Sequence, residues 1–170
     1  METSIWPPPP YLDPAERDRQ LAALAAEIGG ELHHYGASVQ NRPLLTLRLP
    51  ASRSTPTQAT PPAVLCCANL HGIEWIGGLV ALAFARATVT SGTSPFELRQ
   101  RADIWIVPCA NPDGYAATFV TRGDAPLARL RTNAHGVDLN RNFPRPSAGP
   151  IRWAPGAGSA NPKHASSSAY

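Results

Sequence analysis

The chain has 170 residues, of which 43% are hydrophobic and 16% charged, and its formal net charge is +3. This length can bury a core, and the composition is that of a soluble globular protein. The charge is too mild to predict a nucleic acid partner, and no apolar stretch is long enough to cross a membrane.

The first predicted element is a helix that follows a proline-rich segment, 1–12. Asp13 has the form of an N-cap, Pro14 suits the first helical position, and Glu16 stands three residues after the cap. Apolar residues recur on one stripe until Gly29-Gly30, a pair that ends helices. Residues 1–10 have neither the basic leader nor the apolar core of a secretion signal.

Two short strands are predicted next, over 31–35 and 44–49, and the break between them suits an antiparallel hairpin. A loop rich in Pro, Thr and Ser follows over 52–62. The run 63–70 is continuously apolar, which is typical of a strand covered on both faces in a parallel or mixed sheet. His71 directly follows the carboxyl end of this run.

A helix is predicted from residue 73 or 75 to about 86, and a short one over 94–101. A second buried strand covers 104–107 and ends in a turn at 111–114. This alternation predicts an α/β fold, a three-layer α/β/α arrangement with a mixed, partly parallel sheet, in which ligands bind at the carboxyl ends of strands. The composition of 144–170 predicts an irregular tail rich in Pro, Gly, Ser and Ala.

The three cysteines, Cys66, Cys67 and Cys109, lie within or at the ends of apolar runs. An odd number gives no complete disulfide framework. We therefore expect reduced, buried thiols in a reducing compartment, and together with the missing secretion signal this predicts a cytoplasmic protein.

His71 and Glu74 stand three residues apart just after the first buried strand. Two interpretations fit this spacing. A tight turn into the next helix would aim the imidazole and the carboxylate at one point, and zinc accepts both types of ligand. Alternatively, Glu74 stabilises the first turn of the helix and His71 is an ordinary loop residue.

Three motifs occur in the order His71-Gly72-Ile73-Glu74, Asn111-Pro112-Asp113-Gly114, and Arg131-Thr132-Asn133-Ala134-His135-Gly136 leading into Val137-Asp138-Leu139-Asn140-Arg141-Asn142-Phe143-Pro144. In these residues the chain resembles the zinc carboxypeptidase (M14) family, the funnelin-type metallocarboxypeptidases. The resemblance covers about residues 32 to 143 and implies that 13–143 is the N-terminal part of the catalytic domain, with a phosphorylase/hydrolase-like sheet. The last motif looks most like the murein-peptide amidase branch.

The resemblance implies a metallocarboxypeptidase that uses Zn²⁺ and an activated water to hydrolyse the C-terminal peptide or amide bond of a small peptide. His71 and Glu74 would bind the metal, and Asp138 would accept a hydrogen bond from the other ring nitrogen of His71. Asp138 could equally cap a turn. The turn at 111–114 is architectural rather than catalytic in this interpretation.

The same resemblance assigns the substrate contacts. Arg141, with Asn140 as its hydrogen-bonding neighbour, would hold the free C-terminal carboxylate of the peptide, because a guanidinium offers a bidentate, charge-assisted contact. Arg131 would stabilise the oxyanion as charge develops. The alternatives are a surface ion pair for Arg141 and a solvated loop position for Arg131.

The sequence departs from the family pattern after these motifs. Family members carry a third ligand, a histidine, and later a glutamate that acts as general base, and neither has a counterpart here. His164 lies in an irregular polar stretch and is a poor ligand, and His135 is better interpreted as a loop residue. We therefore expect a fold truncated after its first half, low activity, and a tendency to self-associate through an exposed sheet edge.

Two further functions stay open. One is an N-acyl amino acid deacylase of the aspartoacylase or succinylglutamate desuccinylase type, which shares the His-x-x-Glu motif. The other is an inactive fragment that keeps the first half of the fold.

Overall fold

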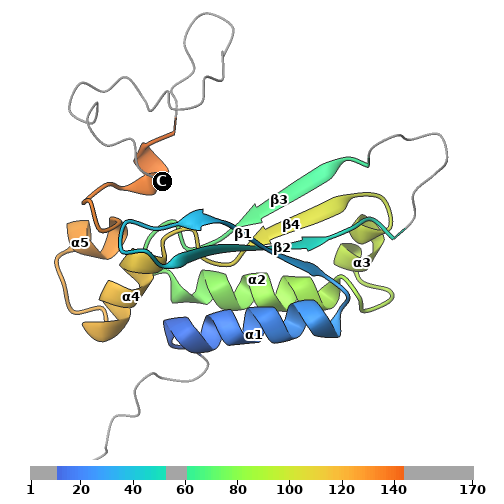
Figure 1. Cartoon of the computed structure of the whole chain (residues 1–170), viewed down its shortest axis with the longest axis horizontal. Helices are drawn as coiled ribbons and strands as arrows, with labels where there is room; N and C mark the ends of the chain where they lie inside the picture. The colour runs from blue at the N-terminus through green and yellow to red at the C-terminus, as the bar shows by residue number, and fades with distance from the viewer. Residues whose placement is uncertain (1–10, 53–60, 144–170) are drawn as a thin grey trace, which may run out of the picture.

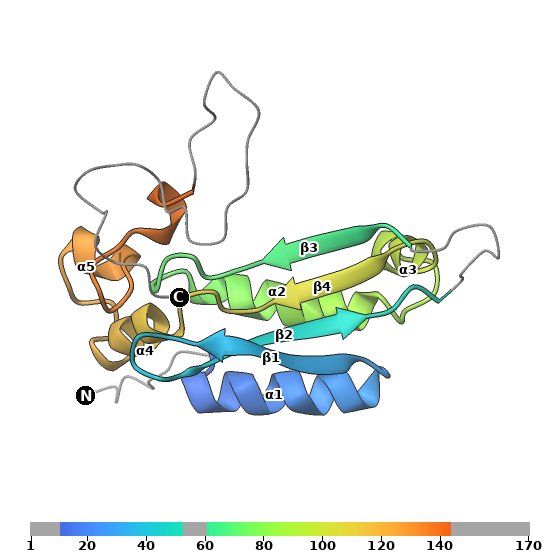
Figure 2. The same cartoon turned by 45° about the horizontal axis from the view of Figure 1, so that its top comes forward.

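The computed structural model describes residues 11–52 and 61–143. Within them, helices α1 (Pro14–Glu27) and α2 (Trp75–Ala87) lie along one face of a four-stranded sheet, as Figures 1 and 2 show. Most of the predicted proline-rich segment, most of the loop at 52–62 and the whole predicted tail, 144–170, lie outside the described residues.

The sheet contains β1 (Glu31–Ala37), β2 (Pro43–Leu49), β3 (Ala63–Cys67) and β4 (Asp103–Val107), in the order β1-β2-β4-β3. The pairs β1–β2 and β2–β4 are antiparallel, whereas β3 and β4 are parallel. The predicted α/β class, mixed sheet and hairpin are therefore confirmed. Because β3 and β4 run parallel, their carboxyl ends lie at the same end of the sheet, and the segments that follow them leave the sheet there.

The predicted start of α1 is confirmed, since the Asp13 carboxylate accepts a hydrogen bond from the backbone N–H of Glu16 at 2.9 Å. The apolar stripes of α1 and α2 pack against β2 and β4. Each large side chain buried in this way contributes about 1.5–3 kcal/mol to stability. The centre of this core consists of Leu21, Leu24, Leu47, Leu49, Ala85, Ile104 and Ile106.

The prediction that the first apolar strand is covered on both faces is wrong. Strand β3 is an edge strand with alternating burial, and Leu65 is 68% exposed. The reason is that α1 and α2 cover only one face of the sheet in the described part of the chain. The expectation of buried thiols fails for the same reason: Cys109 is buried, Cys66 is half-buried and Cys67 is exposed.

The loops beyond the carboxyl ends of β3 and β4 carry α4 (Pro112–Val120), α5 (Leu127–Arg131) and a 3₁₀ turn, η1 (Leu139–Arg141). At the other end of the sheet lies α3 (Ser94–Arg99). No helix in the described ranges is long and apolar enough to span a bilayer.

The turn predicted at 111–114 is in fact the start of α4. Asn111 is its N-cap, and the side-chain oxygen of Asn111 accepts a hydrogen bond from the N–H of Gly114 at 2.9 Å. The helix continues because Tyr115 and Phe119 pack with Trp75 in a second apolar cluster that joins α4 to α2.

Candidate metal and carboxylate site

His71 lies in a tight turn between β3 and α2. Asn69 begins this turn in the left-handed conformation, with φ of 54°, which asparagine tolerates better than most residues. The side-chain amide of Asn69 donates to the carbonyl oxygen of Glu74 at 2.6 Å and closes the turn on itself. His71 is only 5% exposed, so its ring direction is set by neighbouring groups.

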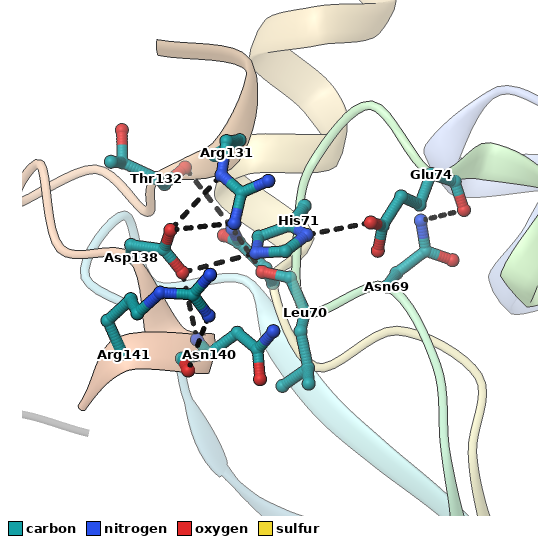
Figure 3. A network of polar contacts seen from close by, with 10 residues as sticks. Asn69, Leu70, His71, Glu74, Arg131, Thr132, Asp138, Asn140 and Arg141 are labelled. Atoms are coloured by element: carbon teal, nitrogen blue, oxygen red, sulfur yellow. Dashed lines mark hydrogen bonds and ion pairs between the residues drawn. The ribbon is translucent and has the colours of Figure 1, made fainter. Parts of the chain in front are cut away.

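The first ring nitrogen of His71 faces Glu74. Nδ1 of His71 lies 2.7 Å from Oε1 of Glu74, and Figure 3 shows the two side chains pointing toward each other. Glu74 is the residue before α2, yet its side chain makes no capping hydrogen bond to the helix. Half of the Glu74 side chain is exposed. The carboxylate of Glu74 therefore contacts His71, and it does not cap α2 by a hydrogen bond.

The second ring nitrogen of His71 faces Asp138, as the family resemblance implies, with Nε2 3.1 Å from Oδ1. The other carboxylate oxygen of Asp138 accepts from Nε of Arg131 at 3.2 Å and lies 3.1 Å from Nη2. Burial alone would raise the pKa of Asp138, but the hydrogen bonds from Arg131 and His71 outweigh it and lower that pKa. Asp138 also caps η1 by accepting from the N–H of Asn140 at 3.0 Å, so both of its predicted contacts are present.

The two arginines come from different segments of the same loop region. Arg131 is the last residue of α5 and is held by Asp138, so it is not a solvated loop residue. Asn140 and Arg141 lie in η1 and are exposed, and the guanidinium of Arg141 donates to the carbonyl oxygen of Asn140 at 3.2 Å. In Figure 3, Asn140 and Arg141 lie with Asp138 on the same side of His71, away from Glu74.

This geometry suits half of a zinc site. An imidazole nitrogen and a carboxylate oxygen converge on one point, and Asp138 fixes the ring from the opposite side, as carboxylates do behind metal-binding histidines. Glu74 and Asp138 cannot meet on one ion beside His71, because they face opposite ring nitrogens. Within residues 11–52 and 61–143, no three His, Cys, Asp or Glu side chains are grouped to hold a metal. His135 is exposed, and His164 is outside these ranges.

Sequence reasoning missed the side chains that support this turn from α4. The sequence predicts only a turn at Asn111 and gives no signal for Thr118. Both are 2% exposed and donate hydrogen bonds to backbone carbonyls of the His71 turn. An Asn-Pro pair, with Asn111 at the N-cap and Pro112 at the first helical position, is a helix-start signal that indicates α4.

Comparisons with known proteins agree with the motifs. A family model described as zinc carboxypeptidase, Peptidase M14, matches residues 20–169. Carboxypeptidase E of Caenorhabditis elegans is 34% identical to the chain over 141 residues, which are 74% of this chain and 29% of that protein. A protein of Sclerotinia sclerotiorum named as an inactive metallocarboxypeptidase is 33% identical over 116 residues, 64% of this chain and 20% of the relative.

Among solved structures, carboxypeptidase A from Helicoverpa armigera matches with a TM-score of 0.53 and 29% identity. The match covers 64% of this chain and 26% of that one. The chain thus spans less than a third of the length of these three proteins. Because the family model matches nearly the whole chain, and the motif residues meet at one edge of a sheet of the same fold, the chain belongs to the zinc carboxypeptidase family, peptidase M14.

Proposed function

We propose that this protein is a zinc-dependent metallocarboxypeptidase that hydrolyses the C-terminal peptide or amide bond of a small peptide. The observation that carries the proposal is the placement of His71, whose two ring nitrogens face Glu74 and Asp138. His71 and Glu74 would hold the ion, and a third ligand and a general base would come from outside the described residues. When bound, zinc lowers the pKa of a water molecule and polarises a carbonyl group.

In this proposal, Arg141 and Arg131 bind different groups of the substrate. Arg141 is exposed and binds the free carboxylate of the peptide, and Asn140 assists it. Arg131 lies deeper, its side chain 31% exposed and fixed by Asp138, so its guanidinium is preorganised for the negative charge that develops on the scissile carbonyl oxygen. The amino-acid sequence of the motif from Arg131 to Phe143 looks most like the murein-peptide amidase branch, and this resemblance favours a murein peptide as substrate.

A second candidate is a metal-free, inactive member of the family. It is favoured by the finding that two ligands, but no third, come together in the described part of the chain. It is also consistent with a relative whose name describes it as inactive. Titration with zinc separates the two candidates.

With only the two ligands that the described residues bring together, the 170-residue chain is expected to bind one zinc ion weakly in a calorimetric titration. His71→Ala and Glu74→Ala should each weaken this binding by more than about tenfold, because that loss is seen when only the partner of a ligand is removed. His135→Ala and Glu97→Ala are matched controls, since both side chains are exposed and lie outside the network, and both should bind zinc as wild type does. Equal zinc binding by the wild type and all four variants would favour the inactive candidate.

Substrate recognition can be tested separately from catalysis. We expect the chain to bind an N-acetylated dipeptide with a free C-terminus more tightly than the same dipeptide with a C-terminal amide. Arg141→Ala should abolish this preference, because a hydrogen bond to a charged group is worth about 1.5–3 kcal/mol. The exposed Arg129 of α5 supplies the control: Arg129→Ala should keep the preference. If the acid and the amide bind equally to the wild type, the assignment of Arg141 is wrong.

A further inference from the structure

Helix α4 holds the backbone on both sides of His71. The hydroxyl of Thr118 donates to the carbonyl oxygen of Gly72, which follows His71, at 2.8 Å. The side-chain amide of Asn111 donates to the carbonyl oxygen of Leu70, which precedes His71, at 3.2 Å. Both donors are 2% exposed, so water does not compete for these bonds.

Each donor has a second contact that fixes it in turn. The oxygen of Thr118 accepts a hydrogen bond from Nε1 of Trp75, the first residue of α2, at 2.9 Å. The amide of Asn111 also donates to the carbonyl oxygen of Thr132 at 3.2 Å, directly after Arg131. Asn111 therefore links the turn that carries His71 to the segment that carries Arg131.

Two glycines bring the turn and the helix into backbone contact. A Cβ atom on Gly72 would lie 2.3 Å from the carbonyl oxygen of Gly114. A Cβ atom on Gly114 would in turn lie 2.4 Å from the side-chain nitrogen of Asn111. The first turn of α4 thus lies directly against the His71 turn, with no side chain between them.

We propose that Thr118 and Asn111 are positioning residues for His71. Both residues act through the backbone, because they fix the peptide groups before and after His71. The position of these groups sets the direction from which the imidazole ring approaches Glu74 and Asp138. This inference rests on the proposed function in one respect, which is that the His71 ring binds zinc. A histidine held in advance loses less conformational entropy when it binds an ion, so loosening the turn should weaken binding without removing a ligand.

The test compares variants of the 170-residue chain by zinc calorimetry and by the ¹⁵N NMR signals of the His71 ring in the zinc-free chain. Thr118→Val removes the hydroxyl and keeps the branched shape of the side chain, whereas Thr118→Ser keeps the hydroxyl and removes the methyl group. Asn111→Ser keeps an oxygen at the helix cap but is too short to reach both carbonyls. Thr88→Val is the matched control, because Thr88 is 1% exposed and donates to the carbonyl of Ala85 at the far end of α2.

Thr118→Val and Asn111→Ser are expected to bind zinc about tenfold more weakly than the wild type and to shift the ring signals of His71. Thr118→Ser and Thr88→Val should match the wild type in both measurements, although Thr88→Val also loses a buried hydrogen bond. If Thr118→Val behaves like Thr88→Val, the inference is overturned while the proposed function stands. If the wild type binds no zinc, the proposed function fails for this chain, and the ring signals alone decide the inference.

Discussion

Gly72→Ala is expected to lower the free energy of unfolding by about 3 kcal/mol, at the upper end of what overpacking costs. The new methyl carbon would lie 2.3 Å from the carbonyl oxygen of Gly114 and 2.4 Å from its carbon. Both atoms belong to backbone, so neither can rotate away as a side chain would. The turn must move off α4, and the hydrogen bonds to the carbonyls of Leu70 and Gly72 are then strained or lost. Urea denaturation measures the loss.

The same substitution should also abolish the zinc binding expected of the wild type, because His71 moves with the turn. Gly77→Ala is the control in the next helix. Its Cβ would lie 3.4 Å from the Cβ of Ala68, which is ordinary contact, and alanine is favoured over glycine in a helix by about 1 kcal/mol. Gly77→Ala should therefore be neutral or stabilising. A Gly72→Ala variant as stable as the wild type would show that α4 and the turn can separate at little cost.

The local elements were predictable because their signals lie within a few residues of one another. Asp13 and Pro14 define the start of α1, and the alternation of strands and helices gives the mixed sheet. The contact between His71 and Glu74 was also accessible, since both residues belong to one turn that directly follows a strand. The contact of His71 with Asp138, 67 residues away, could be anticipated only through the family resemblance.

What the sequence did not reveal depends on long-range packing. Asn111 and Thr118 meet carbonyl groups that are 41 and 46 residues away in sequence, and backbone carbonyls leave no trace in a sequence pattern. Likewise, the apolar run at β3 suggests cover on both faces, but cover depends on which elements reach that face. Leu65 is exposed because, within the described residues, helices lie only behind the opposite face.

Asp113, in the same 111–114 motif as Asn111, gives the second large expected effect on stability, in the variant Asp113→Ala. The Asp113 side chain is 2% exposed. It accepts from the hydroxyl of Ser38 at 2.7 Å, the N–H of Gln40 at 3.1 Å and Nη1 of Arg42 at 2.8 Å. These donors all belong to the turn between β1 and β2. Without the carboxylate they lose a shared acceptor, and because Arg42 is partly exposed, we expect a loss of about 2–3 kcal/mol in unfolding free energy.

The control is the ion pair of Glu27 and Arg86, in which both side chains are more than half exposed. Glu27→Ala should change the unfolding free energy by less than about 0.5 kcal/mol, because water screens such pairs. Hydrogen exchange at the N–H of Gln40 should accelerate in Asp113→Ala but not in Glu27→Ala. If it does not, Asp113 does not hold the hairpin. If it does, the first turn of α4 joins the His71 turn to the β1–β2 hairpin, since Asn111 binds the former and Asp113 the latter.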